Sequence, residues 1–215
     1  MPVAVIVDMV GSRRLPDRPD AQRVLDAAIA DVEAALPLAS QPLRPTVGDE
    51  QQGVYPALEA ALAGLLLLQL ALPDGLECRF GLGIGSIGTI ASVSGDIPDG
   101  PGWWAAREAI EAVHAKQQRA APSARTWVVA SSGEDAGVHR SATLANAYLL
   151  TRDQLVGAMT ERERRLVYGR CLGATQKELA KAQGITQPAV SQALAGAGAH
   201  AILEGFALLR AEVTA

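Results

Sequence analysis

Apolar residues along this chain form blocks whose spacing alternates between the period of strands and that of helices. The block at 3–12 (VAVIVDMVGS) is nearly continuous and rich in β-branched residues, which predicts a buried central strand. The block at 20–36 has its apolar residues at helical spacing and stops at Pro37. The following blocks predict two short strands in 43–56 around Gly48-Asp49, helices at 57–72, 103–120 and about 141–157, strands at 76–88 and 126–132, and a Gly/Pro/Asp loop at 94–102.

This order of elements predicts an α/β (α+β) domain. Helices should pack on a mixed sheet, and the first half of the order fits the ferredoxin-like plan. The most apolar window, 61–72, ends at Pro73-Asp74-Gly75 and is too short to cross a bilayer. We therefore expect a buried or interface helix there and no membrane partner.

The composition changes near Thr160. Beyond it the pattern is helical with short glycine breaks, and residues 160–215 hold seven Lys or Arg against five Asp or Glu, whereas the whole chain has a net charge of −4. The negative total argues against a surface coated in basic residues but is compatible with a local basic patch. We place a domain boundary here, with an α/β domain at 1–158 and a small all-α domain at 159–215.

Segment 175–194 carries the signals of two helices joined by a tight turn. Thr175 and Glu178 have the spacing of a capping box, and Gly184 suits the end of the first helix. Thr186 can cap a second helix through its hydroxyl, and Pro188 lies in the first turn, where its missing N–H costs nothing. The segment therefore predicts a helical pair.

The second helix of the pair is expected to present polar side chains near its start. Val190 and Leu194 lie four residues apart and should face the first helix, which leaves Gln187, Ser191 and Gln192 outward. Recognition helices present base-reading side chains at this place, and glutamine suits adenine.

This segment, together with MTERERRLVY (159–168), resembles the helix-turn-helix of the sigma-region-4 and response-regulator type. The resemblance implies DNA binding, and the candidate contact residues are Thr186, Gln187, Ser191, Gln192, Lys177 and Lys181, with Arg162, Arg164 and Arg165 as further phosphate contacts. The alternative is a helical hairpin used only for dimerisation. In the last helix, 200–213, one face carries Ile202, Leu203, Phe206 and Leu209, which predicts core packing or a dimer contact.

Two acids occupy the ends of predicted strands. Asp8 ends the first strand, and Asp49 lies on the hairpin turn beside Glu50. In a ferredoxin-like sheet the two aspartates are neighbours, and Mg²⁺ prefers carboxylate and phosphate oxygens. Without a cation they would repel and raise each other's pKa. We expect a site for Mg²⁺ or Mn²⁺ with a phosphorylated ligand, against the alternative of a strand-end residue and a plain turn residue.

Four segments in order resemble the class III nucleotide cyclases and, more loosely, the diguanylate cyclases: VDMVGS (7–12), TVGDE (46–50), RFGLGIGSIG (79–88) and GPGWWAARE (100–108). The resemblance implies that Asp8 and Asp49 are metal ligands. It further implies nucleotide or phosphate contacts from Val10, Gly11, Ser12 and Arg107.

One departure from the cyclase pattern concerns the asparagine expected four residues before Arg107. Trp103 stands there, and an indole cannot accept and donate as an amide does. The substitution argues against cyclisation by the usual route. The alternative for Arg107 is an ion pair on the helix surface. Trp103 and Trp104 are expected to cover the sheet or a dimer contact, and the alternative for them is stacking on a base.

The chain as a whole, with DMVGSR, GDE-x-QG, GPGWWAARE and the C-terminal helix-turn-helix, is similar to the SatD family, which implies a regulator. Cys78 and Cys171 lack metal-binding spacing and are expected to stay reduced in the cytoplasm. The resulting hypothesis is a cytoplasmic, homodimeric DNA-binding regulator whose cyclase-like domain senses or binds a nucleotide or related phosphorylated ligand with Mg²⁺. The alternatives are a metal-dependent cyclase, nucleotidyl transferase or phosphohydrolase with an appended helix-turn-helix, and a vestigial cyclase-like dimerisation platform.

Overall fold

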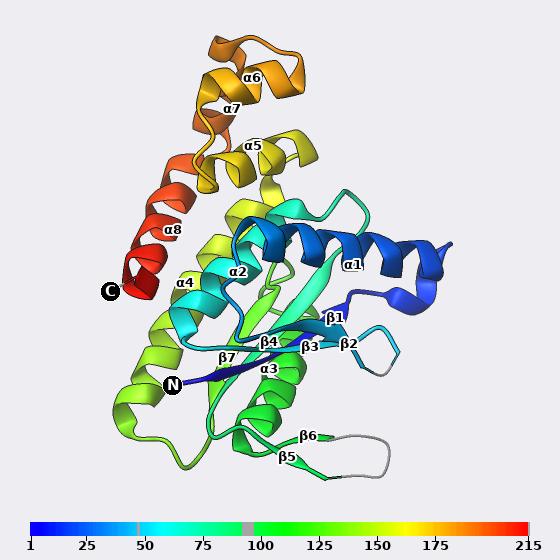
Figure 1. Cartoon of the computed structure of the whole chain (residues 1–215), viewed down its shortest axis with the longest axis vertical. Coiled ribbons are helices and arrows are strands. Elements are labelled where there is room, and N and C mark those ends of the chain that lie inside the picture. The colour runs from blue at the N-terminus through cyan, green and yellow to red at the C-terminus, as the bar shows by residue number, and fades with distance from the viewer. Residues whose placement is uncertain (47, 92–96, 215) are drawn as a thin grey trace.

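A mixed five-stranded sheet lies at the centre of the computed structural model, which describes residues 1–46, 48–91 and 97–214 (Figure 1). The strand order is β2-β3-β1-β4-β7, with β1 antiparallel to both neighbours and β7 parallel to β4. The bounds are β1 (Val3–Met9), β2 (Gln41–Pro45), β3 (Gln51–Tyr55), β4 (Cys78–Ile84) and β7 (Thr126–Ala130). The predicted mixed sheet with packed helices is confirmed.

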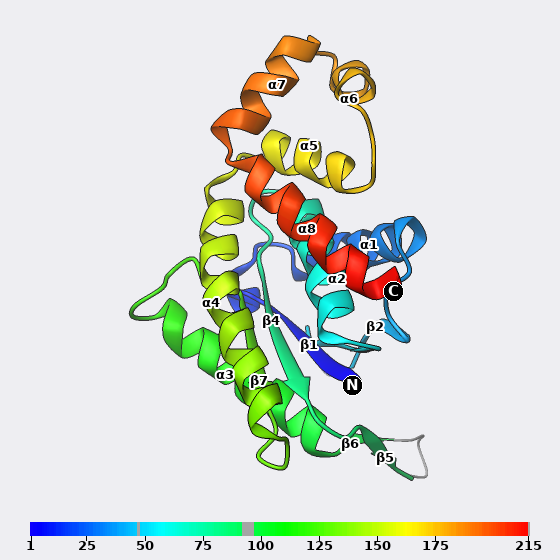
Figure 2. The same cartoon turned by 90° about the vertical axis from the view of Figure 1, so that its left-hand side faces the viewer.

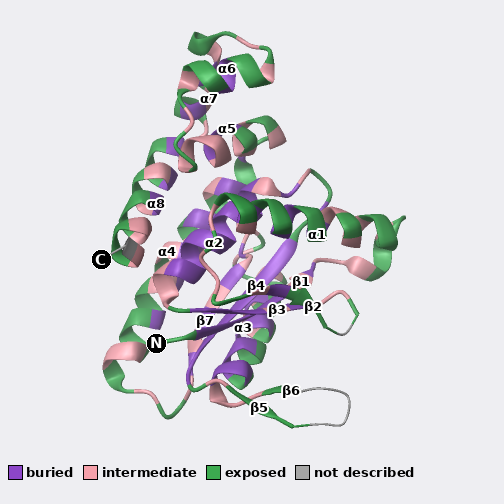
Figure 3. Cartoon of the chain, in the orientation of Figure 1, coloured by how far each residue is buried: buried purple, intermediate pink, exposed green. Residues whose placement is uncertain are grey.

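Alternate residues of β1 face opposite layers of helices. Val5 and Val7 join the core formed with α1 (Arg18–Ala35) and α2 (Leu58–Ala71), whereas Ala4 and Ile6 pack with α3 (Pro101–Gln117) on the other face. Both sets are buried, which explains why the strand reads as one continuous apolar run (Figure 3). Asp8 continues the alternation and so belongs to the α3 face.

The glycines of β4 allow α3 to lie directly on the strand. A Cβ on Gly83 would lie 1.9 Å from the carbonyl oxygen of Gly102 and 2.3 Å from the amide nitrogen of Ala106. A Cβ on Gly81 would lie 2.5 Å from the carbonyl oxygen of Ala106. These glycines therefore serve helix–sheet packing, because any side chain would collide with the helix backbone.

Several predicted elements begin or end at other residues than the sequence pattern suggested. The first strand stops at Met9, because Gly11 adopts a left-handed conformation (φ 67°) and opens the short helix η1 (Ser12–Arg14). The first long helix begins at Arg18, after the cap Asp17. Helix α4 (Ala136–Ala158) begins five residues early, because Asp135 accepts hydrogen bonds from its first turn.

The predicted strand at 76–88 is divided. After β4, a separate hairpin pairs β5 (Gly88–Ile90) with β6 (Ile97–Asp99). The predicted loop at 94–102 falls partly outside the described residues, and its described part contains β6 and the start of α3.

Helix α4 covers β7 at the edge of the sheet. Asn146 accepts from the N–H of Val128 and donates to its carbonyl oxygen, both at 2.8 Å. Two helical turns further along α4, Asp153 accepts hydrogen bonds from the N–H groups of Arg125 (2.7 Å) and Thr126 (2.8 Å). Side chains of a helix thus occupy backbone groups that a further strand would otherwise pair, which protects the edge.

The chain continues as α5 (Glu161–Cys171), α6 (Gln176–Gln183), α7 (Gln187–Gly196) and α8 (Ala199–Thr214). Helix α8 returns along α2, and α5 also contacts α2 (Figure 2). Ile202 and Phe206 are buried, and Leu203 and Leu209 pack against the same core, so this face of α8 packs within the chain. Helix α4 ends at Ala158 and α5 begins at Glu161, and the domain boundary placed at 158/159 stays a prediction.

The most apolar window, 61–72, lies almost entirely in α2, whose residues are mostly buried, and the expected buried helix is found there. No single helix in the described parts is both long and apolar enough to cross a membrane; α7 and residues 199–213 meet that criterion only together, across an 82° bend.

Candidate functional site

Asp8 projects from the end of β1 toward the α3 face of the sheet. Its Oδ2 accepts a hydrogen bond from Nη1 of Arg79 at 2.7 Å, and the two residues are register partners on β1 and β4. Arg79 is largely buried, and its Nε donates to Oε1 of Gln117 at the end of α3 at 2.5 Å. This arrangement joins two strands and a helix through one guanidinium.

Asp49 lies on the turn between β2 and β3, as the sequence pattern indicated. Its Oδ1 forms an ion pair with Nη2 of Arg18, at the start of α1, at 2.9 Å. Its Oδ2 is buried and has no hydrogen-bond partner among the described residues. A buried carboxylate oxygen without a donor is costly, so this atom is the open acceptor of the site.

Glu50 forms the third acidic position. Its Oε1 accepts from Nη2 of Arg107 on α3 at 2.7 Å and from Nε2 of Gln52 at 2.8 Å. The Glu50 side chain is only 17% exposed, which rules out a solvated hairpin tip. Arg107, the candidate phosphate ligand, is therefore held over the acidic hairpin by an ion pair.

Asp49 and Glu50 are close enough to Asp8 to affect its protonation. Burial raises the pKa of Asp8 above its ordinary value, Arg79 opposes this shift, and Asp49 and Glu50 add to it. The pKa of Arg107 is also raised, chiefly by its hydrogen bond to Glu50, with weaker contributions from Glu50, Glu111 and Asp8 charges. The sheet therefore places the hairpin acids within electrostatic reach of Asp8.

The segment predicted to approach phosphates follows Asp8 directly. Gly11 is in the left-handed region, and η1 begins at Ser12, so the backbone turns sharply three residues after Asp8. The N–H of Val10 already donates to the carbonyl oxygen of Glu77 at 2.8 Å. The Val10 N–H is therefore engaged within the chain, and phosphate contacts from Gly11 and Ser12 stay a prediction.

The acidic site offers few side chains to a divalent cation. Within the described residues, no group of three or more His, Cys, Asp and Glu side chains is arranged to hold a metal ion. Mg²⁺ is commonly held by one or two carboxylates together with phosphate oxygens and water. Asp8 and the open Oδ2 of Asp49 are carboxylates of the type that such a cation takes, and their role as its ligands stays a prediction.

The two tryptophans of α3 have different environments. Trp103 is buried with Ala4, Ile6 and Val54 of the sheet, and its Nε1 has no partner among the described residues. Trp104 is exposed, and its Nε1 donates to Oδ1 of Asp99 at 3.0 Å. Trp103 therefore covers the sheet, which is one of the two roles considered for it.

Three residues of this site were not found from the sequence: Arg18, Arg79 and Gln117. Arg79 had a usable signal, since it is the single charge in the buried strand CRFGLGI and lies opposite an acid. Arg18 and Gln117 had none, because nothing local links either to a residue far along the chain.

The helical pair has the predicted local geometry. Thr175 and Glu178 form a capping box, and Gly184 ends α6 in the left-handed conformation (φ 64°). The side chain of Thr186 caps α7 by accepting from the N–H of Ala189 at 3.3 Å. The buried residues of the pair are Leu179, Ala180, Val190 and Leu194, and the exposed ones include Lys177, Lys181, Thr186, Gln187, Ser191 and Gln192.

Comparison with solved structures finds cyclase domains. They include a bacterial light-regulated adenylyl cyclase (14% identity, TM-score 0.43, 59% of this chain and 74% of that chain). Another is the guanylyl cyclase Cya2 (17% identity, TM-score 0.40, 52% and 70%). A third is the guanylyl cyclase domain of RhoGC from the aquatic fungus Blastocladiella emersonii (15% identity, TM-score 0.41, 51% and 72%).

No curated protein matches the sequence. The SatD family model, in contrast, matches residues 2–203, which is nearly the whole chain. The protein belongs to the SatD family.

Proposed function

We propose that the protein is a DNA-binding transcriptional regulator whose α/β domain, 1–158, binds a nucleotide or related phosphorylated ligand with Mg²⁺ or Mn²⁺. The single observation that carries the DNA-binding part is the pair α6–α7. Its short turn, buried inner face and polar outer face match the arrangement that helix-turn-helix proteins use to enter the major groove.

The exposed face of α7 has side chains suited to base edges. Gln187, Ser191 and Gln192 are exposed in the first two turns of a ten-residue helix that is about 15 Å long. Glutamine can contact adenine with both amide atoms, and serine accepts several partners. Lys177 and Lys181 are exposed on α6 and would contact phosphates, which fix the register on the duplex.

The α/β domain offers a place for a phosphorylated ligand beside Asp8 and Asp49. The open Oδ2 of Asp49 favours a cation there, and Arg107 is held only 2.7 Å from Glu50. A phosphate would compete with Glu50 for this guanidinium, since arginine binds carboxylate and phosphate with the same fork. The segment β1-α1-β2-β3-α2-β4 supports a ferredoxin-like unit, because its strand order β2-β3-β1-β4 agrees with that plan.

Coupling between the two parts would work through a homodimer. Paired half-sites on DNA lie about 34 Å apart, so a change in dimer geometry changes affinity. We propose that ligand binding at the acidic site shifts the dimer and thereby the spacing of the two α7 helices.

The test of DNA binding uses the full chain and random-sequence duplexes. Enriched sequences are measured by fluorescence anisotropy with wild type, the double variant Gln187→Ala/Gln192→Ala, and the matched control Gln118→Ala, whose glutamine is exposed at the end of α3. We expect the double variant to lose about tenfold or more in affinity and the control to bind as wild type. Absence of any enriched sequence and of salt-dependent binding would refute the proposal.

The raised pKa of Asp8 favours a second candidate, a metal-dependent enzyme acting on nucleotides, because perturbed carboxylates gather at catalytic sites. Trp103 in place of the asparagine argues against cyclisation. Incubation with each NTP and Mg²⁺ or Mn²⁺, followed by product analysis beside Asp49→Ala, decides. If a product forms with the wild type and is lost in the variant, the protein is an enzyme. If no product forms and no nucleotide binds, the α/β domain is a dimerisation platform.

A further inference from the structure

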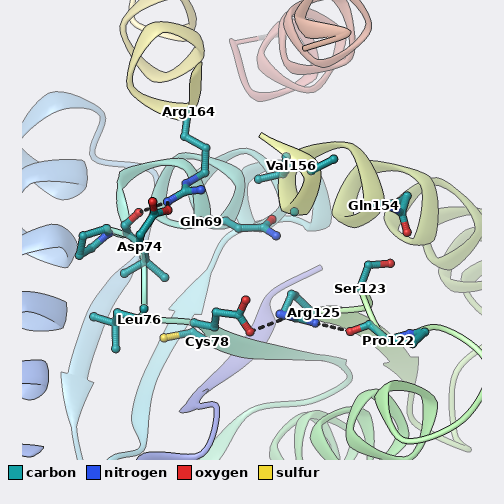
Figure 4. A pocket seen from close by; sticks show the side chains of 16 residues that line it. Gln69, Asp74, Leu76, Cys78, Pro122, Ser123, Arg125, Gln154, Val156 and Arg164 are labelled. Atoms are coloured by element: carbon teal, nitrogen blue, oxygen red, sulfur yellow. Dashed lines mark hydrogen bonds and ion pairs between the residues drawn. The ribbon is translucent and has the colours of Figure 1, made fainter. Parts of the chain in front are cut away.

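A cavity of about 460 Å³ lies where the C-terminal helices meet the α/β part (Figure 4). Its walls come from the end of α2, the start of β4, the segment before β7, the end of α4 and the side chain of Arg164 on α5. Cys78 lines it and pairs in register with Met9, so the cavity is on the α2 face of the sheet. Asp8 points to the opposite face, which makes this a second site.

The deep wall contains one polar side chain whose bonding is incomplete. Gln69 is the polar residue within the buried run of α2, it is 91% buried (9% exposed), and its Oε1 has no hydrogen-bond partner among the described residues. Figure 4 shows this amide between the Arg164–Asp74 pair and Arg125. The apolar part of the wall includes Leu72, Leu76 and Val156. An occupant that donates a hydrogen bond to Oε1 would remove the cost of that unpaired acceptor.

The two arginines at the rim are already neutralised. Arg164 pairs with Asp74 at 2.8 Å, and Arg125 pairs with Glu77 at 2.7 Å. Each guanidinium makes three hydrogen bonds within the described residues, whereas it carries five N–H groups. The rim can therefore still donate to a carbonyl oxygen, but it has no surplus positive charge with which to attract an anion.

We propose that this cavity binds a neutral small molecule with an amide group, a cyclic amide of about nucleobase size. The amide N–H donates to Oε1 of Gln69, and the amide carbonyl accepts from Arg125 or Arg164. The volume lies within the range of pockets that hold small organic ligands, and the mixture of apolar wall and few polar groups is typical of them. The inference stands apart from the proposed DNA-binding and nucleotide functions.

Occupancy would also affect the junction of the two parts of the chain. Arg164 holds α5 to the α2–β4 turn, because its Nη2 donates to the carbonyl oxygen of Leu72 at 3.1 Å as well as to Asp74. The N–H of Asp74 in turn donates to Oε2 of Glu161 at 3.0 Å. A ligand that contacts both Gln69 and Arg164 would tie α5 more firmly to the α/β part.

The experiment follows the side-chain amide resonances of the full-length protein by NMR during titration with uracil, hypoxanthine and 2-pyridone, which are neutral cyclic amides. Its ligand control is 1,3-dimethyluracil, which has the same ring and carbonyls but no N–H donor. Its protein variants are Gln69→Leu and the matched control Gln118→Leu. We expect at least one of the three amides to shift the Gln69 resonance. The affinity for 1,3-dimethyluracil should be at least tenfold weaker than the affinity for uracil.

In Gln69→Leu the binding, followed by saturation transfer to the probe, should fall at least tenfold, while Gln118→Leu should bind as wild type. Without ligand, Gln69→Leu should melt at a higher temperature than wild type, because leucine has a similar volume and removes an unpaired buried acceptor. If Gln69→Leu does not fold, the Gln69 resonance in the wild type decides alone. The proposal is overturned if none of the three amides shifts that resonance, if uracil and its dimethyl derivative bind equally, or if Gln69→Leu binds as tightly as wild type.

Discussion

The fully buried ion pair between Arg152 and Asp153 provides the sharpest prediction of stability. Both side chains are 0% exposed, and Oδ1 of Asp153 accepts from Nε (3.1 Å) and Nη2 (2.7 Å) of Arg152. Arg152 also donates to the hydroxyl of Thr126, and its Nη1 has no partner among the described residues. The guanidinium therefore depends on one carboxylate for its charge balance.

We predict that Asp153→Asn lowers the free energy of unfolding by about 3–5 kcal/mol, the range found when one partner of a buried pair is removed. Asparagine can still accept from the backbone N–H groups of Arg125 and Thr126, so the cost comes mainly from the uncompensated charge. The double variant Arg152→Met/Asp153→Asn removes both charges at similar volume. We expect it to lose only about 1–2 kcal/mol, since a buried pair and an apolar replacement are often nearly equal in stability.

Urea unfolding followed by circular dichroism measures these values, and an unchanged dependence on urea shows that the native fold is retained. Wild type, Asp153→Asn, Arg152→Met and the double variant form a double-mutant cycle. The cycle gives the coupling energy between the two positions, which we expect to be about 2 kcal/mol or more. A loss below about 1 kcal/mol for Asp153→Asn, or a double variant that costs the sum of the single ones, would refute this account of the pair.

Three further predictions concern the strand glycines, the helix turn and the acidic site. Gly83→Ala should prevent folding, because its Cβ would lie 1.9 Å from a backbone oxygen. Gly157→Ala has nothing within 4 Å of its Cβ, so it should fold and gain about 0.5–1 kcal/mol in free energy of unfolding. Thermal melting compares the two variants. Gly184→Ala should cost on the order of 1 kcal/mol at φ 64°, and a melting temperature equal to wild type would contradict the proposed strain. Because the pKa of Asp8 is raised, the native state binds more protons than the unfolded state above pH about 4. The contribution of Asp8 to stability therefore falls as the pH rises. Asp8→Asn should reduce this pH dependence of the free energy of unfolding, measured with urea between pH 4 and pH 7.

Local chemistry was sufficient where neighbours in sequence decide the conformation. The capping box of Thr175, the left-handed Gly184 and the cap Thr186 depend on atoms within a few residues, and all three follow from the sequence. The alternation in β1 likewise indicated a strand with two buried faces. Helix starts at Arg18 and Ala136 were misplaced, because the capping residues lie just before segments whose apolar period begins later.

The candidate site was predictable only in part, since its acids carry a sequence signal and their partners do not. Asp8 and Asp49 end predicted strands, and a sheet brings such ends together. The pairing of Asp49 with Arg18 and of Glu50 with Arg107 required the positions of α1 and α3, which lie on opposite faces of the sheet.

The sequence by itself determined the order of the elements, the burial of α2 and the outward polar face of α7, because hydrophobic period and capping chemistry act over a few residues. Only the tertiary structure decided that β4 glycines accommodate α3, that α4 covers the edge of β7, and that α8 packs on α2. It also created the cavity at Gln69 from five separate segments. These features are contacts between residues distant along the chain, and no local pattern records which distant backbone a side chain will meet.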